Sequence, residues 1–255
     1  GKLAANATRR LMVLWRDTAS PGPASYAPGA SFWREAQQTI VTPAYEARFE
    51  HGTLTFLAAR KDGVTGRQFL KSLILSSAET GWSDEDGKVE EFQVEHSGPV
   101  RTIIKVRKAL KAGVVYEKRY TFYPQRFDVE ITLNKSAGGL YSRAHYVEQG
   151  TYTDDKGNKA TVDGKGDGED VYGKNRNPKW YAVFARDWAH SCVALSPFDH
   201  IAYWDAGGGW GAIGLTTGQL KGIRMSYVIH SGASDAAFAE EDHRRLTTPM
   251  TLAWE

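Results

Sequence analysis

Apolar and polar residues alternate with a period of two along most of the chain. In residues 127–133 every second residue is apolar, from Phe127 to Leu133, and the residues between them are polar. This pattern is typical of a half-buried antiparallel strand. Residues 114–123 alternate in the same way, and the short turn between the two segments predicts a β-hairpin. The pattern recurs in residues 45–58, with a break at His51 and Gly52, and in residues 69–76, 92–95, 100–106, 180–186, 192–195, 201–204 and 223–230.

Ten or more such segments, with turn signals at short intervals, predict two large antiparallel sheets packed face to face. Only one helix is expected. It lies near the C-terminus, where Ser234 can cap its first turn and Pro249 prevents its continuation. We therefore expect an all-β fold of the large sandwich type with one short C-terminal helix, forming a single soluble domain over residues 1–255.

Two stretches have no regular pattern. Residues 1–44 are expected to form an extended N-terminal segment, because residues 17–30 are rich in Pro, Gly and Ala. Residues 150–178 are rich in Gly, Asp, Lys and Asn and are expected to form a long loop. Long irregular connections in compact domains often bind ligands, so we predict that this second stretch forms the rim of a binding cleft.

Charge and composition argue against several classes of function. The 32 basic and 30 acidic side chains nearly cancel and are scattered, so the chain has no electrostatic footprint for nucleic acid. No run of 18 or more apolar residues occurs, so we expect no membrane partner. The single cysteine, Cys192, lies in an apolar stretch, which favours a buried thiol over a nucleophile.

The most suggestive chemistry lies in residues 141–146. In an extended strand Tyr141, Arg143 and His145 project to the same face, with neighbours roughly 7 Å apart. A phenol, an imidazole and a guanidinium are the groups needed to remove the proton next to a uronate carboxylate. Arg143 would neutralise the carboxylate, and Tyr141 or His145 would serve as base and acid. The alternative is that these are ordinary polar residues on a solvent-facing strand, explained by cross-strand pairing.

A second pair of candidate catalytic residues follows the long loop. Residues 177–181 open a strand, so Lys179 and Tyr181 share a face. A cation and a phenol at the junction of a loop and a strand suit an acidic sugar. The alternative is a lysine at a strand edge beside core aromatic residues.

Tryptophans are clustered in the C-terminal half of the chain, and flat aromatic rings stack on the C–H faces of sugars. There are four tryptophans in this cluster. One or two of them are expected to contact a glycan, and the others to lie in the core. His190, next to the strand of Cys192, is a further candidate for substrate binding. The four tryptophans are Trp180, Trp188, Trp204 and Trp210, the last flanked by glycines and expected to be the most exposed.

A cofactor is not expected, with calcium as the one alternative. Residues 163–170 are rich in Asp and Gly, which resembles a calcium loop with Asp163 and Asp167 as ligands. Lys165 and Lys174 occupy positions where an EF-hand needs oxygen ligands. A solvated turn is therefore the favoured interpretation, and a calcium site of another kind the alternative.

Several segments carry a resemblance to a known superfamily. Residues 97–106, which begin Ser-Gly-Pro-Val-Arg, lead into the aromatic-rich hairpin of residues 116–133, as in sandwich domains of the galactose-mutarotase-like superfamily, including those of polysaccharide lyases. Residues 177–181 and 238–249 also resemble secreted, sugar-active members. The resemblance covers residues 45–250.

This resemblance implies a β-supersandwich with a sugar-binding cleft on one concave sheet. Lyase members use Tyr and His with an Arg or Lys near the uronate, which Tyr141, Arg143, His145, Lys179 and Tyr181 match in chemistry. The expected function is thus a polysaccharide lyase that cleaves a uronate-containing polysaccharide or oligosaccharide by β-elimination, secreted or periplasmic if an export signal has been removed.

Two other functions stay open on the same scaffold. One is a non-catalytic carbohydrate-binding or accessory domain. The other is an aldose epimerase or a glycoside hydrolase. An epimerase could pair His145 with Glu148 or His190, whereas a hydrolase would need two carboxylates across the cleft. The plausible suppliers of those carboxylates are Glu148, Asp187 and Asp205.

Overall fold

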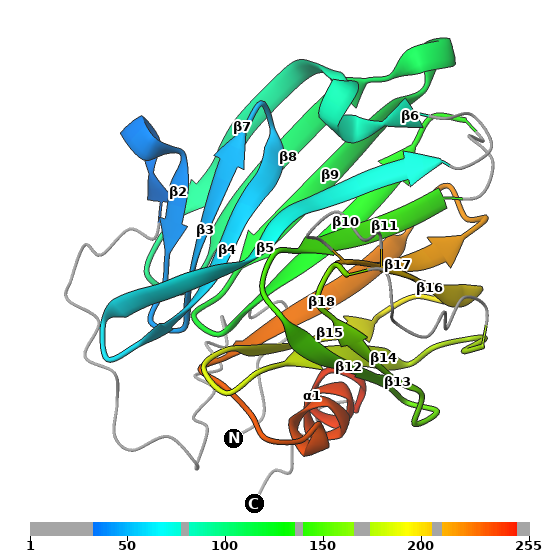
Figure 1. The fold of residues 1–255 in the computed structure, drawn as a ribbon. Helices are drawn as coiled ribbons and strands as arrows, with labels where there is room; N and C mark the ends of the chain where they lie inside the picture. Colours follow the sequence, from blue (N-terminus) through cyan, green and yellow to red (C-terminus); the bar gives the residue numbers. More distant parts are fainter. Residues whose placement is uncertain (1–32, 78–81, 136–139, 166–173, 206–210, 249–255) are drawn as a thin grey trace, which may run out of the picture.

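The computed structural model describes residues 33–77, 82–135, 140–165, 174–205 and 211–248 (Figure 1). In this part of the chain two nine-stranded sheets pack face to face, and every strand pair is antiparallel. The all-β sandwich predicted from the alternation is confirmed.

The first sheet, called sheet A, contains most strands of the N-terminal part together with three later ones. Its order is β1 (Trp33–Arg34), β2 (Thr39–Val41), β3 (Tyr45–Glu50), β4 (Thr53–Lys61), β5 (Val64–Ser77), β11 (Leu140–Tyr146), β17 (Gly211–Thr217) and β16 (His200–Asp205), with β6 (Trp82–Ser83) paired to β5.

The second sheet, sheet B, forms the other layer of the sandwich (Figure 1). Its order is β13 (Lys159–Val162), β12 (Gly150–Asp154), β14 (Trp180–Phe184), β15 (Ala189–Ala194), β18 (Ile223–His230), β10 (Arg126–Leu133), β9 (Val115–Phe122), β8 (Thr102–Ala109) and β7 (Lys88–Ser97). Three short 3-10 helices connect strands: η1 (Glu35–Gln37), η2 (Asp84–Asp86) and η3 (Lys111–Gly113).

The predicted turns and helix are found. The hairpin of β9 and β10 pairs Phe122 with Phe127. The break between β3 and β4 falls on His51 and Gly52, whose φ values of 47° and 69° form the tight turn. The predicted helix is α1 (Ala237–Thr247), which packs on β14 and β15, so it covers part of the outer face of sheet B. Ser234 does not cap it: the N-cap residue is Ala236, and Asp235 Oδ1 accepts a hydrogen bond from the Ala237 amide at 3.0 Å.

Two predicted irregular segments contain regular structure. Residues 150–162 form β12 and β13 instead of a continuous loop, because the alternating pattern around Tyr152 supplies a strand that pairs with β14. The described part of residues 1–44 contains β1, η1 and β2. Trp33 of β1 packs against Phe92 of β7, with ring centroids 5.9 Å apart, and so closes one edge of the sandwich.

The core lies between the sheets and is filled by the apolar face of each strand. Aromatic rings contribute much of it. Phe69 of sheet A stacks on Trp188 at 4.6 Å between centroids, and Phe127 stacks on Tyr227 at 5.0 Å. Among the described residues, no helix is long and apolar enough to cross a membrane.

Candidate functional site

The predicted triad lies on the outer face of sheet A, the face turned away from sheet B. Leu140, Ala144 and Tyr146 of β11 are buried in the core between the sheets. Tyr141, Arg143 and His145 alternate with them and are half-buried. The three polar residues therefore share one face, as the alternation predicts.

Strand pairing aligns further residues with this triad in rows across sheet A. Tyr141 lies opposite Ser76 of β5 and Thr216 of β17, and Thr216 in turn lies opposite His200 of β16. The first row therefore adds a second imidazole, two strands away from Tyr141. Backbones of neighbouring strands are about 4.8 Å apart, so His200 is about 10 Å from the backbone of Tyr141.

On β17 the residues aligned with Arg143 and His145 are small. Arg143 lies opposite Gly214, which pairs with Ala202, and His145 lies opposite Ala212, which pairs with Trp204. Ala202 and Ala212 are fully buried, whereas Arg143 and His145 are half-buried. The small residues thus form a floor below the taller polar side chains of β11.

A carboxylate of η2 acts on Arg143. Ser83 of β6 pairs with Ser76 of β5, Ser76 also lies opposite Tyr141, and Glu85 follows Ser83 in η2. Burial lowers the pKa of the Arg143 guanidinium, and the negative charge of Glu85 acts in the opposite direction and raises it. Glu85 is therefore within electrostatic range of Arg143.

The imidazole of His145 is held in its neutral form. Burial, with smaller contributions from the positive charges of Arg143 and Lys71, lowers the pKa of His145 from 6.5 to about 4. The pairing of β5 with β11 shifts register beside His145, and Lys71 is the extra residue at this bulge. Bulges re-aim side chains in this way. At neutral pH His145 can accept a proton or a hydrogen bond at one ring nitrogen.

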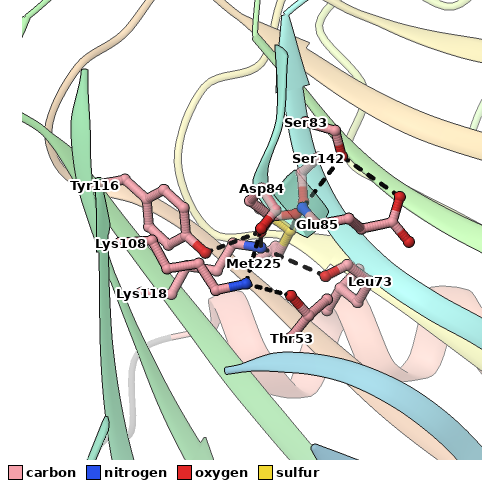
Figure 2. Close-up of polar contacts among 10 residues, drawn as sticks. All are labelled: Thr53, Leu73, Ser83, Asp84, Glu85, Lys108, Tyr116, Lys118, Ser142 and Met225. Carbon is pink, nitrogen blue, oxygen red and sulfur yellow. Dashed lines mark hydrogen bonds and ion pairs between the residues drawn. The ribbon is translucent and has the colours of Figure 1, made fainter. Parts of the chain in front are cut away.

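Below this face, a cluster of charged residues lies inside the sandwich (Figure 2). The fully buried Asp84 accepts hydrogen bonds at Oδ2 from Lys118 Nζ and, at 3.1 Å, from Tyr116 Oη. Lys108 Nζ donates to the backbone carbonyl of Asp84 at 2.7 Å and to Thr53 Oγ1 at 2.6 Å. Sheet B thus holds both the side chain and the backbone of Asp84.

This cluster fixes the position of η2. Asp84 is the first residue of η2 and is fully buried, whereas Glu85, the next residue, is exposed. Removing one partner of a buried ion pair typically costs about 3–5 kcal/mol, because the other charge stays buried. The link from Asp84 to sheet B therefore holds the first residue of η2 firmly, and with it the backbone of Glu85.

The second predicted catalytic pair does not lie with the triad. Tyr181 is fully buried in the core, where it packs against Tyr152 at 6.3 Å and His190 at 5.9 Å between ring centroids. Sheet A separates it from Arg143. Lys179 is exposed just before β14 of sheet B, and its backbone amide donates to Asp155 Oδ1 at 3.3 Å.

The predicted substrate-binding residues are also spread over the molecule. Trp188 is in the core, and His190 is fully buried with its Nε2 2.7 Å from Tyr146 Oη. Burial lowers the pKa of His190 to about 3. Trp180 lies beneath α1 and donates from Nε1 to Glu240 Oε2 at 2.8 Å. Trp204 is on β16 opposite Ala212, in the row of His145. Trp210 is outside the described residues.

Of the two predicted calcium ligands, only Asp163 lies in the described part of the chain. Asp163 Oδ1 accepts a hydrogen bond from the backbone amide of Lys165 at 3.1 Å, and Asp163 Oδ2 lies 2.7 Å from Lys165 Nζ. The ammonium thus occupies the place next to this carboxylate. Asp167 is outside the described residues, so its role stays a prediction. Where the structure describes the chain, no group of three or more His, Cys, Asp or Glu side chains could hold a metal ion.

Two residues near the triad were missed by sequence reasoning. They are Glu85 and Lys71, whose places depend on segments that are distant in the sequence. His200 was expected only as a second-tier candidate beside the cleft, and the pairing of β16 with β17 places it in the row of Tyr141. Ser83, Asp84 and Glu85 are all polar and resemble a loop in the sequence. Only the structure shows that Asp84 is buried and Glu85 exposed.

Comparisons with known proteins identify the fold. No protein-family description matches the sequence, and no curated protein is similar to it. Among solved structures, an alpha-mannosidase from Enterococcus faecalis V583 matches with a TM-score of 0.61 at 12% identity, over 88% of this chain and 32% of that one. The alpha-N-acetylgalactosaminidase NagBb from Bifidobacterium bifidum matches with a TM-score of 0.60 at 14% identity, over 82% of this chain and 38% of that one.

A heparan sulfate lyase, HepC from Pedobacter heparinus, superposes less closely, with a TM-score of 0.46 at 9% identity, over 76% of this chain and 36% of that one. The first two matches show that the chain has a β-sandwich fold that also occurs in carbohydrate-active enzymes. The chain spans about a third of the length of these proteins.

Proposed function

We propose that this chain is the β-sandwich domain of a carbohydrate-active protein and that it binds an acidic glycan on the outer face of sheet A. The observation that carries this proposal is the arrangement of Tyr141, Arg143 and His145 on one face, half-buried beside a floor of small residues. The fold shared with the two glycosidases supports a glycan ligand.

The charges on this face favour an acidic sugar. Arg143 and Lys71 are positive, His145 is neutral at pH 7, and Glu85 supplies one negative charge. A guanidinium can bind a carboxylate through two parallel hydrogen bonds, which makes Arg143 the anchor for a uronate. The small residues of β17 leave room for a sugar ring beside it.

The same residues can supply the chemistry of β-elimination. Arg143 would neutralise the uronate carboxylate, so that removal of the neighbouring proton becomes less costly. The neutral imidazole of His145 would accept this proton, and the Tyr141 hydroxyl would donate one to the departing sugar oxygen. The product would be an unsaturated sugar at the new chain end.

The test is ultraviolet absorbance of the unsaturated product during incubation with a panel of uronate polysaccharides. We expect a rise with the wild type that Tyr141→Phe and His145→Ala abolish. Tyr123→Phe, which changes a half-buried phenol on the hairpin of β9 and β10, is the matched control and should retain the activity. If Tyr141→Phe and His145→Ala, each still folded by circular dichroism, cleave as fast as the wild type, this catalytic assignment is wrong.

A second candidate function is non-catalytic glycan binding. The observation that favours it is that the second predicted catalytic pair, Lys179 and Tyr181, does not lie with the triad. An accessory domain would bind the same acidic polysaccharides without producing unsaturated ends. Retarded migration of the wild type in gels that contain these polysaccharides, with no rise in absorbance, would decide for this function.

A further inference from the structure

The row of residues that contains Tyr141 continues beyond the last strand of sheet A. The strands β5, β11, β17 and β16 follow one another across the sheet (Figure 1). Each contributes one residue to the row, in the order Ser76, Tyr141, Thr216 and His200. His200 also forms an isolated antiparallel bridge with Arg176, which lies outside the named strands. The row therefore ends in an arginine.

Arg176 faces the same side of the sheet as the triad. Ile201 and Tyr203 of β16 are buried in the core, so His200, which alternates with them, faces outward. Residues directly opposite each other in an antiparallel pair have their side chains on the same face. Arg176 is exposed, so it adds an accessible positive charge to the outer face of sheet A.

The backbone on both sides of Arg176 is bonded to β16 and the residue before it. The amide of Asn177 donates to the carbonyl oxygen of Asp199 at 3.1 Å, and the amide of Ile201 donates to the carbonyl oxygen of Asn175 at 3.0 Å. Because these bonds flank the bridge, Arg176 and its partner form a non-hydrogen-bonded pair, the kind in which side chains lie closest.

The side chain before Arg176 anchors this segment to the other sheet. Asn175 is fully buried, and its Nδ2 donates to Asp155 Oδ1 at 2.7 Å, next to the end of β12. The fold, and not a free loop, therefore sets the position of Arg176. Burial lowers the pKa of His200, the charge of Asp199 opposes this, and the charge of Arg176 adds to it. Arg176 is thus the positive group at this end of the row at neutral pH.

The distance between Arg176 and Arg143 limits what can contact both. Arg176 is three strand spacings from β11, or about 14 Å, and Arg143 is two residues along β11 from Tyr141, or about 7 Å. The two backbones are therefore about 16 Å apart. Side chains stand roughly perpendicular to a sheet, which keeps the two guanidinium groups apart. A uronate ring has one carboxylate, so pairing both arginines takes two separate acidic sugars.

We propose that Arg176 is a second anion-binding residue of this face and that the glycan bound there is an oligosaccharide with acidic groups on at least two separated sugars. Arg143 binds one carboxylate beside the triad, and Arg176 binds another at the end of the row. The second contact forms at the high effective concentration that the first one creates. This inference rests on the proposed function of the same face.

Oligosaccharides of two lengths test it. The probes are disaccharides and hexasaccharides of polygalacturonate, alginate and hyaluronate, titrated calorimetrically into the wild type and Arg176→Gln. An exposed charge pair contributes little, so we expect Arg176→Gln to lose about two- to fivefold in hexasaccharide affinity at low ionic strength. Its disaccharide affinity should be unchanged, because a disaccharide held at Arg143 does not reach Arg176. The loss should shrink in concentrated sodium chloride.

The control for net charge is Arg224→Gln. Arg224 is an exposed arginine of β18 that faces away from the core, because Ile223 and Met225 on either side of it are buried there. It lies on sheet B and should bind both lengths like the wild type. An unchanged hexasaccharide affinity in Arg176→Gln, an equal loss for both lengths, or an equal loss in Arg224→Gln would overturn the inference.

The same titrations distinguish this inference from the proposed function. If Arg143→Gln weakens binding of both lengths while Arg176→Gln weakens neither, the second position is wrong and the proposed ligand stands. If the wild type binds none of these oligosaccharides, the proposed function is wrong and this inference fails with it.

Discussion

Replacing Lys108 by Met should make the stability of the protein less dependent on pH in the alkaline range. Lys108 is fully buried, and its Nζ donates only to neutral oxygens of Thr53 and the Asp84 backbone. Burial is the main cause that lowers the pKa of Lys108, from 10.5 to about 8, while the charge of Asp84 opposes it.

The magnitude and sign follow from linkage between protonation and folding. Below pH 8 the side chain is protonated in both the folded and the unfolded chain. Between about pH 8 and 10.5 it is neutral when folded and protonated when unfolded, so the free energy of unfolding rises with pH. A shift from 10.5 to about 8, at about 1.4 kcal/mol per pKa unit, gives a rise of about 3 kcal/mol across this range.

Urea denaturation between about pH 7 and 10 measures this effect. Other groups titrate in the same range, so the relevant quantity is the difference in free energy of unfolding between the wild type and Lys108→Met. That difference should rise with pH in favour of the wild type. Lys111→Met, at an exposed position in η3, is the control and should show no such trend. A constant difference between the wild type and Lys108→Met would refute this account of the buried cluster.

Three further outcomes are expected. Asp84→Asn should lower the free energy of unfolding by about 3–5 kcal/mol in urea, because the buried ammonium group of Lys118 loses its carboxylate partner. A loss within about 0.5 kcal/mol, the usual effect of a surface change, would contradict this. NMR titration should place the pKa of His145 near 4, and a midpoint near the ordinary value of about 6.5 would mean that burial does not govern it. Gly232→Ala should lower the melting temperature more than Gly157→Ala. A Cβ at Gly232, where φ is 141°, would meet the carbonyl oxygen of Arg186, whereas a Cβ at Gly157 would have nothing within 4 Å. Equal losses of melting temperature would argue against that contact.

The alternation of apolar and polar residues was sufficient to predict the sandwich. Each strand buries one face, so period two in the sequence maps directly onto inside and outside, as Tyr141, Arg143 and His145 show. The same rule places Tyr181 inward, in the core of the other sheet. The pattern does not show which strands are neighbours or which sheet each strand joins. It therefore could not show that Tyr181 lies in a different sheet from the triad.

Residues that depend on pairing between distant segments could not be found from the sequence. The strand β6, which leads into Glu85, and β11, which carries Arg143, are brought together because both pair with β5, over a separation of more than fifty residues. Lys108 and Lys118 have the charge typical of exposed strand positions, yet both point inward toward Asp84. Buried lysines are rare, so sequence reasoning assigns them to the surface.

The most direct test of the central claim is the affinity of uronate oligosaccharides for the wild type and Arg143→Gln, measured by titration calorimetry. A hydrogen-bonded charge contact is worth about 1.5–3 kcal/mol, so Arg143→Gln should lose tenfold affinity or more. Arg107→Gln, which changes an exposed arginine paired with Glu90 on the outer face of sheet B, should bind like the wild type. Equal affinities of Arg143→Gln and the wild type, or an equal loss in Arg107→Gln, would contradict a glycan site on the outer face of sheet A.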